Sequence, residues 1–266
     1  MLPGMPWRAD FDWTFTEGDA SLPDAFVQEF SASMPARYRV LFDPGTIRRH
    51  ATVSHRREMR PAYAEVWRTL PDGSAAMCIV GEDRPGLLST IAAALVLHRL
   101  DVLTALVFSR PLNETKREAV DLVWVRRANA TDKEPIRPEE AVSVGEVLSA
   151  ILAGKISVEQ IASRTAGSPP APDARIVVRF DDADDEGLAA LFIDAPDRPG
   201  ILLTIAHVLF QQGAQIVRSL VRTADGRAFN RFEISEFNGG PLSPQRREQI
   251  REAVHAALTC ETPGPP

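Results

Sequence analysis

Two copies of one short motif constrain the fold of this chain more than any other feature of its sequence. Asp83-Arg84-Pro85-Gly86-Leu87-Leu88 recurs as Asp197-Arg198-Pro199-Gly200-Ile201-Leu202, and the match continues without a gap into the segments that follow. The copies are too far apart for a solenoid repeat, and their separation is close to the size of a small domain. We therefore expect two domains of the same type.

The residues around each motif predict a strand and then a helix that is buried on one face. In the second copy, residues 188–194 form an apolar run of strand length, and Asp197 and Pro199 are typical of a helix cap and first turn. Gly213 stands where a left-handed C-cap is expected. Apolar residues recur at helical spacing between these points: Leu202, Ile205, Ala206, Leu209 and Phe210. The first copy has the same stripe.

An extra strand candidate precedes each copy, at residues 62–69 and 175–181. As a hairpin partner it would lie antiparallel to the first core strand, in the slot of the fourth strand of a ferredoxin-like sheet. Two more strands and a helix are expected in each copy, at residues 102–109, 118–126 and 142–153, and at residues 215–223, 228–235 and from Ser243 onward. The predicted fold class is α+β: two tandem ferredoxin-like domains, each with an added amino-terminal strand in the edge position.

The same patterns divide the chain into four parts. We expect domains at residues 61–165 and 174–260, with a Pro-rich linker at residues 166–173. Residues 1–60 are a small amino-terminal segment with helices near residues 23–33 and 44–58. This segment is too short for a core of its own, so it is expected to pack on the repeats or on another protein. Its basic residues, 48–50 and 55–57, fit a solvated helix face better than a docking site.

Composition excludes several classes of protein. Apolar residues make up 44% and charged residues 25%, as in globular proteins, and the net charge of -6 disfavours nucleic acid and anionic lipid as partners. No apolar run approaches the roughly 20 residues of a membrane span, and the amino terminus does not resemble a signal peptide, so a cytoplasmic location is expected. Cys78 is expected in the core, and two distant cysteines exclude a disulfide framework. His98 and His207 lack a second ligand at helical spacing, so neither a metal nor another cofactor is expected.

The repeated motif, placed between a strand and an amphipathic helix, resembles the strand-to-helix junction of ACT domains, which regulate amino-acid metabolism. Residues 34–38 and 43–50 look like the connector that precedes the first ACT domain in bacterial PII-uridylyltransferase/uridylyl-removing enzymes. The carboxy-terminal part of these enzymes carries two ACT domains in tandem. The resemblance covers approximately residues 34–258.

Those enzymes place a nucleotidyltransferase domain and an HD phosphohydrolase domain before this region, and the chain has no room for either. It shows no Gly-Ser pair followed by Asp-x-Asp in a strand, and none of its five histidines is followed by Asp. We therefore expect no enzyme activity, and a uridylyltransferase name given on similarity alone would be misleading.

The two motif corners are the candidate ligand site. Free N–H groups at a helix start bind carboxylates, and glycine permits close approach of backbone or ligand. In ACT domains that bind amino acids, a polar side chain in this loop and another at the start of the next strand hold the ligand at a domain interface. Carried over by position, the candidates are Asp83, Gly86, Leu87 and Asp101 in the first copy, and Asp197, Gly200, Ile201 and Gln215 in the second. Gln215 can both donate and accept, which favours the second copy, whereas Asp101 beside Asp83 would suit an ammonium group. In the structural alternative, the aspartates only cap helices and the glycines only relieve steric conflict.

By this resemblance, the leading hypothesis is a non-catalytic regulatory protein that binds a free amino acid at ACT interfaces, with glutamine as the first candidate. It would signal to an unknown protein partner in nitrogen or amino-acid metabolism. One alternative is a ligand-free interaction or dimerisation module, and another is a regulatory remnant or subunit of a PII uridylyltransferase. The two copies could pair their sheet edges within the chain or in a homodimer.

Overall fold

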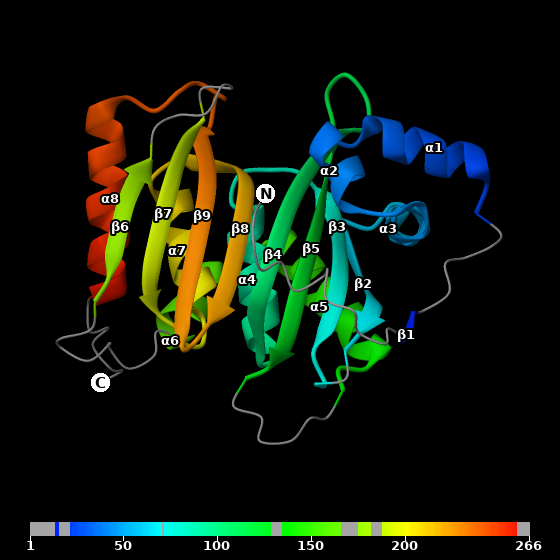
Figure 1. Cartoon of the computed structure of the whole chain (residues 1–266), viewed down its shortest axis with the longest axis horizontal. Coiled ribbons are helices and arrows are strands. Elements are labelled where there is room, and N and C mark those ends of the chain that lie inside the picture. Colours follow the sequence, from blue (N-terminus) through cyan, green and yellow to red (C-terminus); the bar gives the residue numbers. More distant parts are fainter. Residues whose placement is uncertain are drawn as a thin grey trace.

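The computed structural model describes residues 14–15, 22–70, 72–128, 135–165, 175–181 and 188–259. In this part the chain forms one nine-stranded sheet flanked by helices (Figure 1). The strands are β1 (Thr14–Phe15), β2 (Ala62–Thr69), β3 (Ala75–Glu82), β4 (Leu100–Pro111), β5 (Arg117–Arg127), β6 (Val177–Asp181), β7 (Ala189–Pro196), β8 (Ala214–Ala224) and β9 (Arg227–Glu236). The helices are α1 (Asp24–Ser33), α2 (Ala36–Leu41), α3 (Pro44–Arg57), α4 (Leu87–Leu97), α5 (Pro138–Leu152), α6 (Val158–Thr165), α7 (Ile201–Gln211) and α8 (Pro244–Thr259).

The two repeats fold alike. The sheet order is β1-β2-β3-β5-β4-β8-β9-β7-β6. Counted from the centre of the sheet outward, the first repeat contributes β4, β5, β3 and β2, and the second contributes the equivalent strands β8, β9, β7 and β6. β2 pairs antiparallel with β3, and β6 pairs antiparallel with β7. The predicted α+β fold, with an added strand in the edge position of each ferredoxin-like domain, is therefore confirmed. The linker predicted at residues 166–173 lies outside the described residues.

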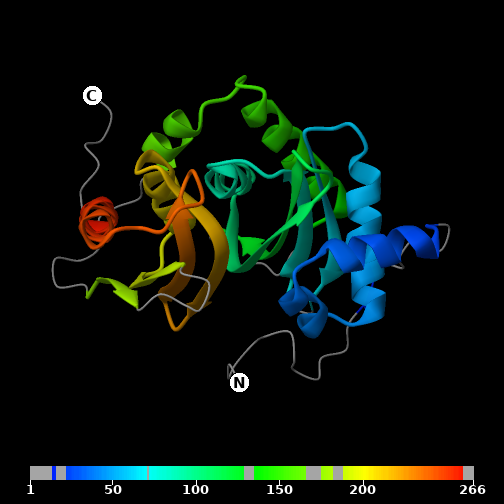
Figure 2. The ribbon, with the colours of Figure 1, turned by 90° about the horizontal axis from the view of Figure 1, so that it is seen from above.

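The repeats join through their inner edges. Residues Thr104, Ala105 and Leu106 of β4 pair antiparallel with Arg222, Val221 and Leu220 of β8. On one face of this joined sheet, α4 packs against α7 (Figure 2). A single apolar core runs through both repeats. The sheet edges that the sequence left open are thus paired within the chain.

Helix α6 was not predicted from the sequence. It contacts both α4 and α7, and it begins where the Ser157 hydroxyl accepts a hydrogen bond from the Gln160 amide at 3.3 Å. Only Ile161 of this helix is buried. One buried position in eight residues gives no periodic apolar stripe, which is why the pattern did not reveal the helix.

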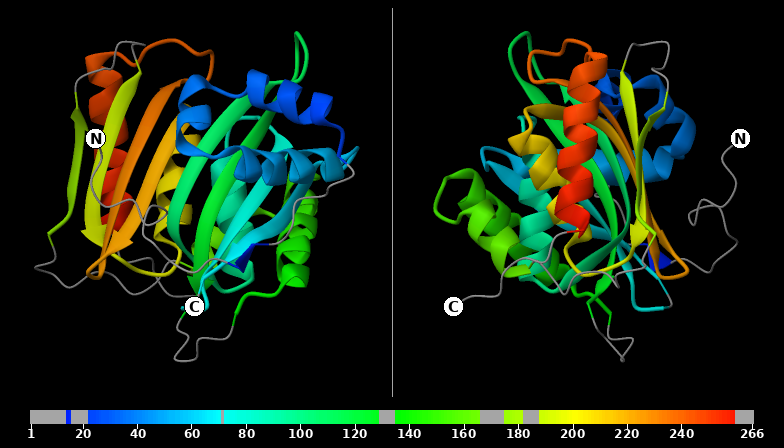
Figure 3. Two further views of the ribbon diagram at one scale, coloured as in Figure 1. Left: turned by 45° about the vertical axis from the view of Figure 1, so that its right-hand side comes forward. Right: turned by 90° about the vertical axis from the view of Figure 1, so that its left-hand side faces the viewer.

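The amino-terminal helices cover the opposite face of the first repeat (Figure 3), and Leu220 of β8 packs against the edge of their apolar cluster. Tyr38 and Phe42 pack edge-on against Phe108 of β4, and His50 packs edge-on against Trp67 of β2. Tyr38 Oη and His50 Nδ1 share a hydrogen bond of 2.7 Å, and His50 has no exposed surface. The expectation of a solvated basic face at residues 48–50 is therefore wrong for His50, because α3 turns this side chain into an aromatic core.

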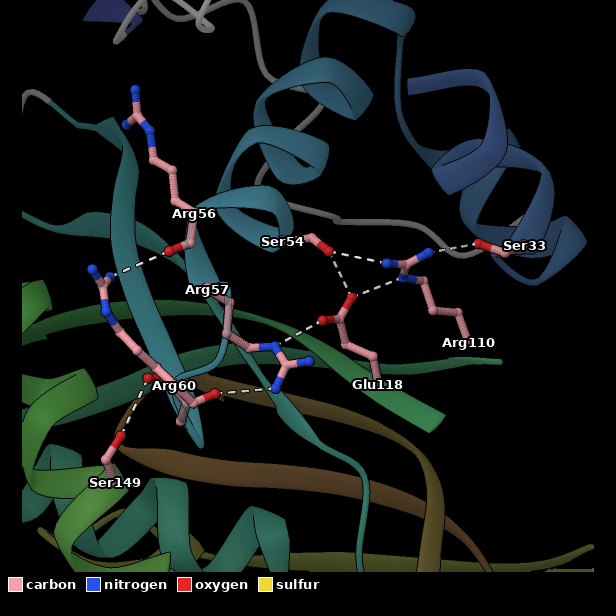
Figure 4. Close-up of polar contacts among 9 residues, drawn as sticks. Ser33, Ser54, Arg56, Arg57, Arg60, Arg110, Glu118 and Ser149 are labelled. Atoms are coloured by element: carbon pink, nitrogen blue, oxygen red, sulfur yellow. Dashed lines mark hydrogen bonds and ion pairs between the residues drawn. The ribbon is translucent and has the colours of Figure 1, made fainter. Parts of the chain in front are cut away.

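A buried ion cluster fixes the amino-terminal segment to the sheet (Figure 4). Glu118 of β5 is 1% exposed and accepts hydrogen bonds from Ser54 Oγ at 2.6 Å, Arg57 Nε at 2.9 Å and Arg110 Nε at 2.8 Å. Arg110 also donates to Ser33 Oγ at 3.0 Å. The cluster connects α1, α3, β4 and β5. Removing one partner of such a pair leaves uncompensated buried charge, which is strongly destabilising.

Two further sequence expectations concern the core and the helices. Cys78 is fully buried with a free thiol, as predicted. Among the described helices, none is both long and apolar enough to cross a membrane.

Candidate ligand crevices between the two repeats

Each motif corner joins a strand to a helix through a left-handed glycine. Gly86 and Gly200 have φ angles of 81° and 76° and are the N-cap residues of α4 and α7. This left-handed conformation favours glycine, because glycine has no Cβ to clash with the backbone. Neither helix has a side-chain cap, so the prediction that Asp83 and Asp197 cap these helices is wrong. The Arg-Pro-Gly segment separates each aspartate from the first helical residue, which places the carboxylate before the capping position.

The corner of the first repeat faces the second repeat across a narrow first crevice. Its walls include Asp83, Gly86 and Leu87 from the first repeat, and Phe210 and Gln215 from the second. The Phe210 ring lies so close to the corner that a Cβ built on Gly86 would be 2.7 Å from Phe210 Cδ2. Glycine is therefore required here both for its φ angle and for the approach of this ring.

A second crevice lies at the matching place on the other repeat. Asp197, Gly200 and Ile201 come from the second repeat, and Asp101 and Val96 come from the first. Together the two crevices bring in all eight residues that the sequence predicts for the ligand site. The grouping differs from the prediction, since the resemblance placed Asp83 with Asp101 and Asp197 with Gln215. In the structure each corner meets the strand of the other repeat, so Asp83 lies in the crevice of Gln215 and Asp197 in that of Asp101.

Each crevice also contains a buried polar residue that the sequence analysis missed. Asp121 of β5 lines the first crevice and Asn230 of β9 lines the second. They occupy equivalent positions, because Asp121 pairs with Ile79 and Val107, whereas Asn230 pairs with Ile193 and Val221. Both are 1% exposed. Within the described part of the chain, Asp121 Oδ1 and both side-chain polar atoms of Asn230 have no hydrogen-bond partner.

The first crevice is rich in acceptors. Asp83 accepts a hydrogen bond from Ser109 Oγ and lies 3.8 Å from the exposed Arg117 guanidinium. Gln215 Oε1 is buried and, among the described residues, unpartnered. Burial raises the pKa of Asp121 well above the usual range of a carboxyl group, and the Asp83 carboxylate raises it further, while a hydrogen bond from the Phe108 amide opposes both effects.

The second crevice has a more balanced charge. Arg126 Nη2 lies 3.5 Å from Asp197 Oδ2. Burial raises the pKa values of both Asp101 and Asp197, and the Arg126 guanidinium opposes that rise. At the strand position equivalent to that of Asp121, this crevice has the neutral side-chain amide of Asn230.

The space in both crevices is small. The hollows measure about 20 Å³ and 30 Å³, enough for a water molecule but not for an amino acid. The first turn of a helix leaves N–H groups without intrahelical acceptors, and the dipole favours an anion there. Among the described residues, no group of three His, Cys, Asp or Glu side chains could hold a metal ion. The crevices therefore offer hydrogen-bonding groups for a small polar ligand, and such a ligand requires them to open.

Comparison with known proteins gives a consistent family of relatives. The chain is 27% identical over 243 residues to a bifunctional uridylyltransferase/uridylyl-removing enzyme of Xanthomonas oryzae pv. oryzae. It is 26% identical over 236 residues to the enzyme of the same name from Rhodospirillum rubrum, and 23% identical over 246 residues to that from Gluconobacter oxydans. These matches cover 88%, 85% and 90% of this chain but only 26%, 24% and 25% of the relatives. The chain thus spans about a quarter of the length of the curated relatives it matches.

Other comparisons add little. No protein-family model matches the chain. A solved structure from Galdieria sulphuraria, 18% identical, covers 70% of this chain and 91% of that one with a TM-score of 0.21, too low to support an argument. The chain therefore combines a repeated α+β fold with similarity to about a quarter of the length of uridylyltransferase/uridylyl-removing enzymes from three bacterial genera.

Proposed function

We propose that this chain is a non-catalytic sensor that binds a free amino acid in the crevices between its two ACT domains. One observation carries the proposal: all eight predicted site residues line the interdomain crevices, and each crevice contains a buried polar side chain with unpartnered atoms among the described residues. A buried polar atom without a partner costs about 1–3 kcal/mol. A ligand that supplies the missing partners would offset this cost.

Ligand binding would change the packing of the two domains. A ligand carboxylate would accept hydrogen bonds from first-turn N–H groups of a corner helix. The closed first crevice holds only about 20 Å³, so the ligand has to move Phe210 away from Gly86 or shift the domains. It would therefore prefer an open packing and shift the population by its differential affinity for that state. Glutamine is the first candidate, on the resemblance to the uridylyltransferase/uridylyl-removing enzymes.

The amino-terminal helices offer a route from the first crevice to a partner protein. Ser109 and Arg117 contact Asp83 at the crevice, and their chain neighbours Arg110 and Glu118 hold α1 and α3 on the opposite face. A displacement of Asp83 would thus act on the same β4–β5 hairpin that positions these helices. We place the contact with a partner in nitrogen or amino-acid metabolism on this helical side of the first repeat.

The similarity to part of a larger enzyme supports a second candidate function. The chain would then be a regulatory remnant or subunit of a PII uridylyltransferase, and it would alter the activity of a separate catalytic chain. On its own it would be inert towards UTP and PII. Uridylyl transfer by the purified chain would contradict the non-catalytic part of both proposals.

A thermal-shift panel of the twenty amino acids tests the sensor proposal. A ligand at about 100 times its dissociation constant adds about 2.7 kcal/mol to the stability of the folded state. We expect one amino acid, with glutamine tested first, to raise the melting temperature in a concentration-dependent way. Absence of a shift with all twenty would contradict the sensor and favour the ligand-free interaction module.

A further inference from the structure

We infer that the two crevices differ in ligand class: the first binds the α-ammonium group of the amino acid through Asp121, with Asp83 and Gln215 as further acceptors, whereas the second does not bind an ammonium group. This inference rests on the proposed function, and it predicts one bound amino acid per chain. It assigns a role to Asp121, which the sequence pattern did not identify.

Asp121 is placed as an anchor for a cation. Its side chain is 1% exposed, lies between the apolar residues Ile79 and Val107 of neighbouring strands, and lines the first crevice. No ion pair to Asp121 occurs among the described residues, and its Oδ1 is unpartnered. A carboxylate buried without a countercharge is strongly disfavoured, so this site is most stable when a cation enters the crevice.

The number of free acceptors in the first crevice matches an ammonium group. Such a group has three N–H donors and no acceptor. The crevice offers Asp121 Oδ1 and Gln215 Oε1, both buried and without partners in the described chain, together with the partly used carboxylate of Asp83. Two cations lie nearby, and neither pairs with Asp121: Arg117 lies 3.8 Å from Asp83 on the exposed side, and Arg84 donates to the Leu152 carbonyl at 3.0 Å.

The second crevice has no fully buried carboxylate among the described residues. Asn230 stands at the position of Asp121 and is neutral, with both a donor and an acceptor that are unpartnered among the described residues. The two acids that line it, Asp101 and Asp197, are only half-buried and already lie near the Arg126 guanidinium, which opposes the rise of both pKa values. An ammonium group entering here would gain no buried countercharge from Asn230 and would approach an existing cation. The amide of Asn230 instead suits a neutral polar group or a water molecule.

Isothermal titration calorimetry with the tightest-binding amino acid of the panel tests the inference on the whole chain. For the wild type we expect a stoichiometry of one, and no binding of the matching α-hydroxy acid, in which a hydroxyl replaces the ammonium group. The substitution Asp121→Asn preserves the shape of the side chain but removes its charge, and it should weaken binding by at least about tenfold. Asn230→Ala, at the equivalent position of the other repeat, should leave the affinity within about twofold of the wild-type value.

Thermal melts of both variants provide the control for folding, since Asp121→Asn is expected to melt no lower than the wild type. If the amino acid binds Asp121→Asn as tightly as the wild type, if the α-hydroxy acid binds equally well, or if Asn230→Ala is the variant that loses binding, the inference is wrong while the sensor proposal stands. If no amino acid binds the wild type, the sensor proposal fails, and this inference fails with it.

Discussion

The two crevices are built from the same backbone but differ in their side chains. Both corners use a left-handed glycine at the start of a buried helix, with φ angles of 81° and 76°. At equivalent strand positions, however, one has the buried acid Asp121 and the other the amide Asn230. The repeated motif therefore fixes where a ligand can lie, and the residues that differ between the copies determine which chemical group each crevice accepts.

The outer faces of the two repeats differ as well. Helices α1, α2 and α3 cover the first repeat (Figure 3), whereas of these three only α2 borders the second repeat, where it lines a hollow with β8 and β9. Among the described elements, only the first repeat therefore connects a crevice to an added helical layer. Point substitutions at matched positions of the two repeats test these differences.

The largest effect is expected from the ion cluster that distinguishes the first repeat. Glu118→Gln leaves Arg57 and Arg110 without their countercharge, so the free energy of unfolding should fall by about 3–5 kcal/mol. Arg227 occupies the equivalent position in the second repeat and pairs with Asp194 at a partly exposed site, so Arg227→Ala should cost about 1 kcal/mol or less. Urea denaturation measures both variants. Equal losses would show that the cluster does not distinguish the repeats.

The close approach at the first corner should produce the next largest effect. Gly86→Ala combines a strained left-handed backbone with a clash against Phe210, so we expect a loss of about 2–3 kcal/mol. Gly154→Ala is the matched control, since Gly154 also has a positive φ angle but no atom within 4 Å of the Cβ that alanine would add. Its loss should be about 1–2 kcal/mol from the backbone alone. Adding Phe210→Ala to Gly86→Ala should reduce the steric part, and the absence of any such reduction would contradict the contact between this ring and the corner.

His50 makes the helical layer of the first repeat sensitive to acid. Burial lowers the pKa of His50 from 6.5 to about 3. Because the folded state holds the neutral imidazole, the unfolded state binds the proton first, so stability is lost as the pH falls from about 6.5 towards 3. Between about pH 7 and about pH 5 the loss should be about 2 kcal/mol. His50→Gln should flatten this part of the pH profile in urea denaturation, and an unchanged slope would contradict a buried neutral histidine.

The smallest effect concerns Asp121 in the ligand-free protein. Its pKa is raised in the folded state, so at neutral pH the carboxyl group opposes folding, and this cost disappears as the pH falls below its folded pKa. Asp121→Asn should therefore stabilise the protein at about pH 7 by about 1 kcal/mol, with a smaller gain in acid. Parallel denaturation of Asn230→Asp should show the opposite sign. A loss of stability in Asp121→Asn at neutral pH would mean that the carboxylate already has a countercharge.

Local pattern was sufficient to predict the repeated fold. The strand at residues 62–69 was predicted with the bounds that β2 has, because it lies one short turn before an apolar strand. The corner glycines also stood out, since the motif repeats around them. The aspartate caps were wrong because sequence spacing alone does not reveal that the Pro-Gly pair delays the helix start.

The composition of each crevice depends on long-range packing, which local patterns do not contain. Nothing near Asp83 in the sequence indicates that it meets Gln215 of the other repeat rather than Asp101 of its own. Asp121 was overlooked because one polar residue in a strand normally marks a solvent face. Here β5 is covered on both faces, by α4 and α5 on one side and by the amino-terminal helices on the other, so the same residue is buried. Asp121 alternates along the chain in step with Ala119 and Val123, which indicates that it shares their buried face. This inference requires knowing that a second layer covers the sheet.

The position of the bound amino acid is the central claim, and amide hydrogen exchange of the whole chain measures it directly. With the tightest-binding amino acid of the panel at saturation, we predict slower exchange at residues 86–89 and 214–216, which belong to the first crevice, and little change at residues 200–203. Protection on the outer face of the sheet instead, or equal protection at both corners, would contradict this account.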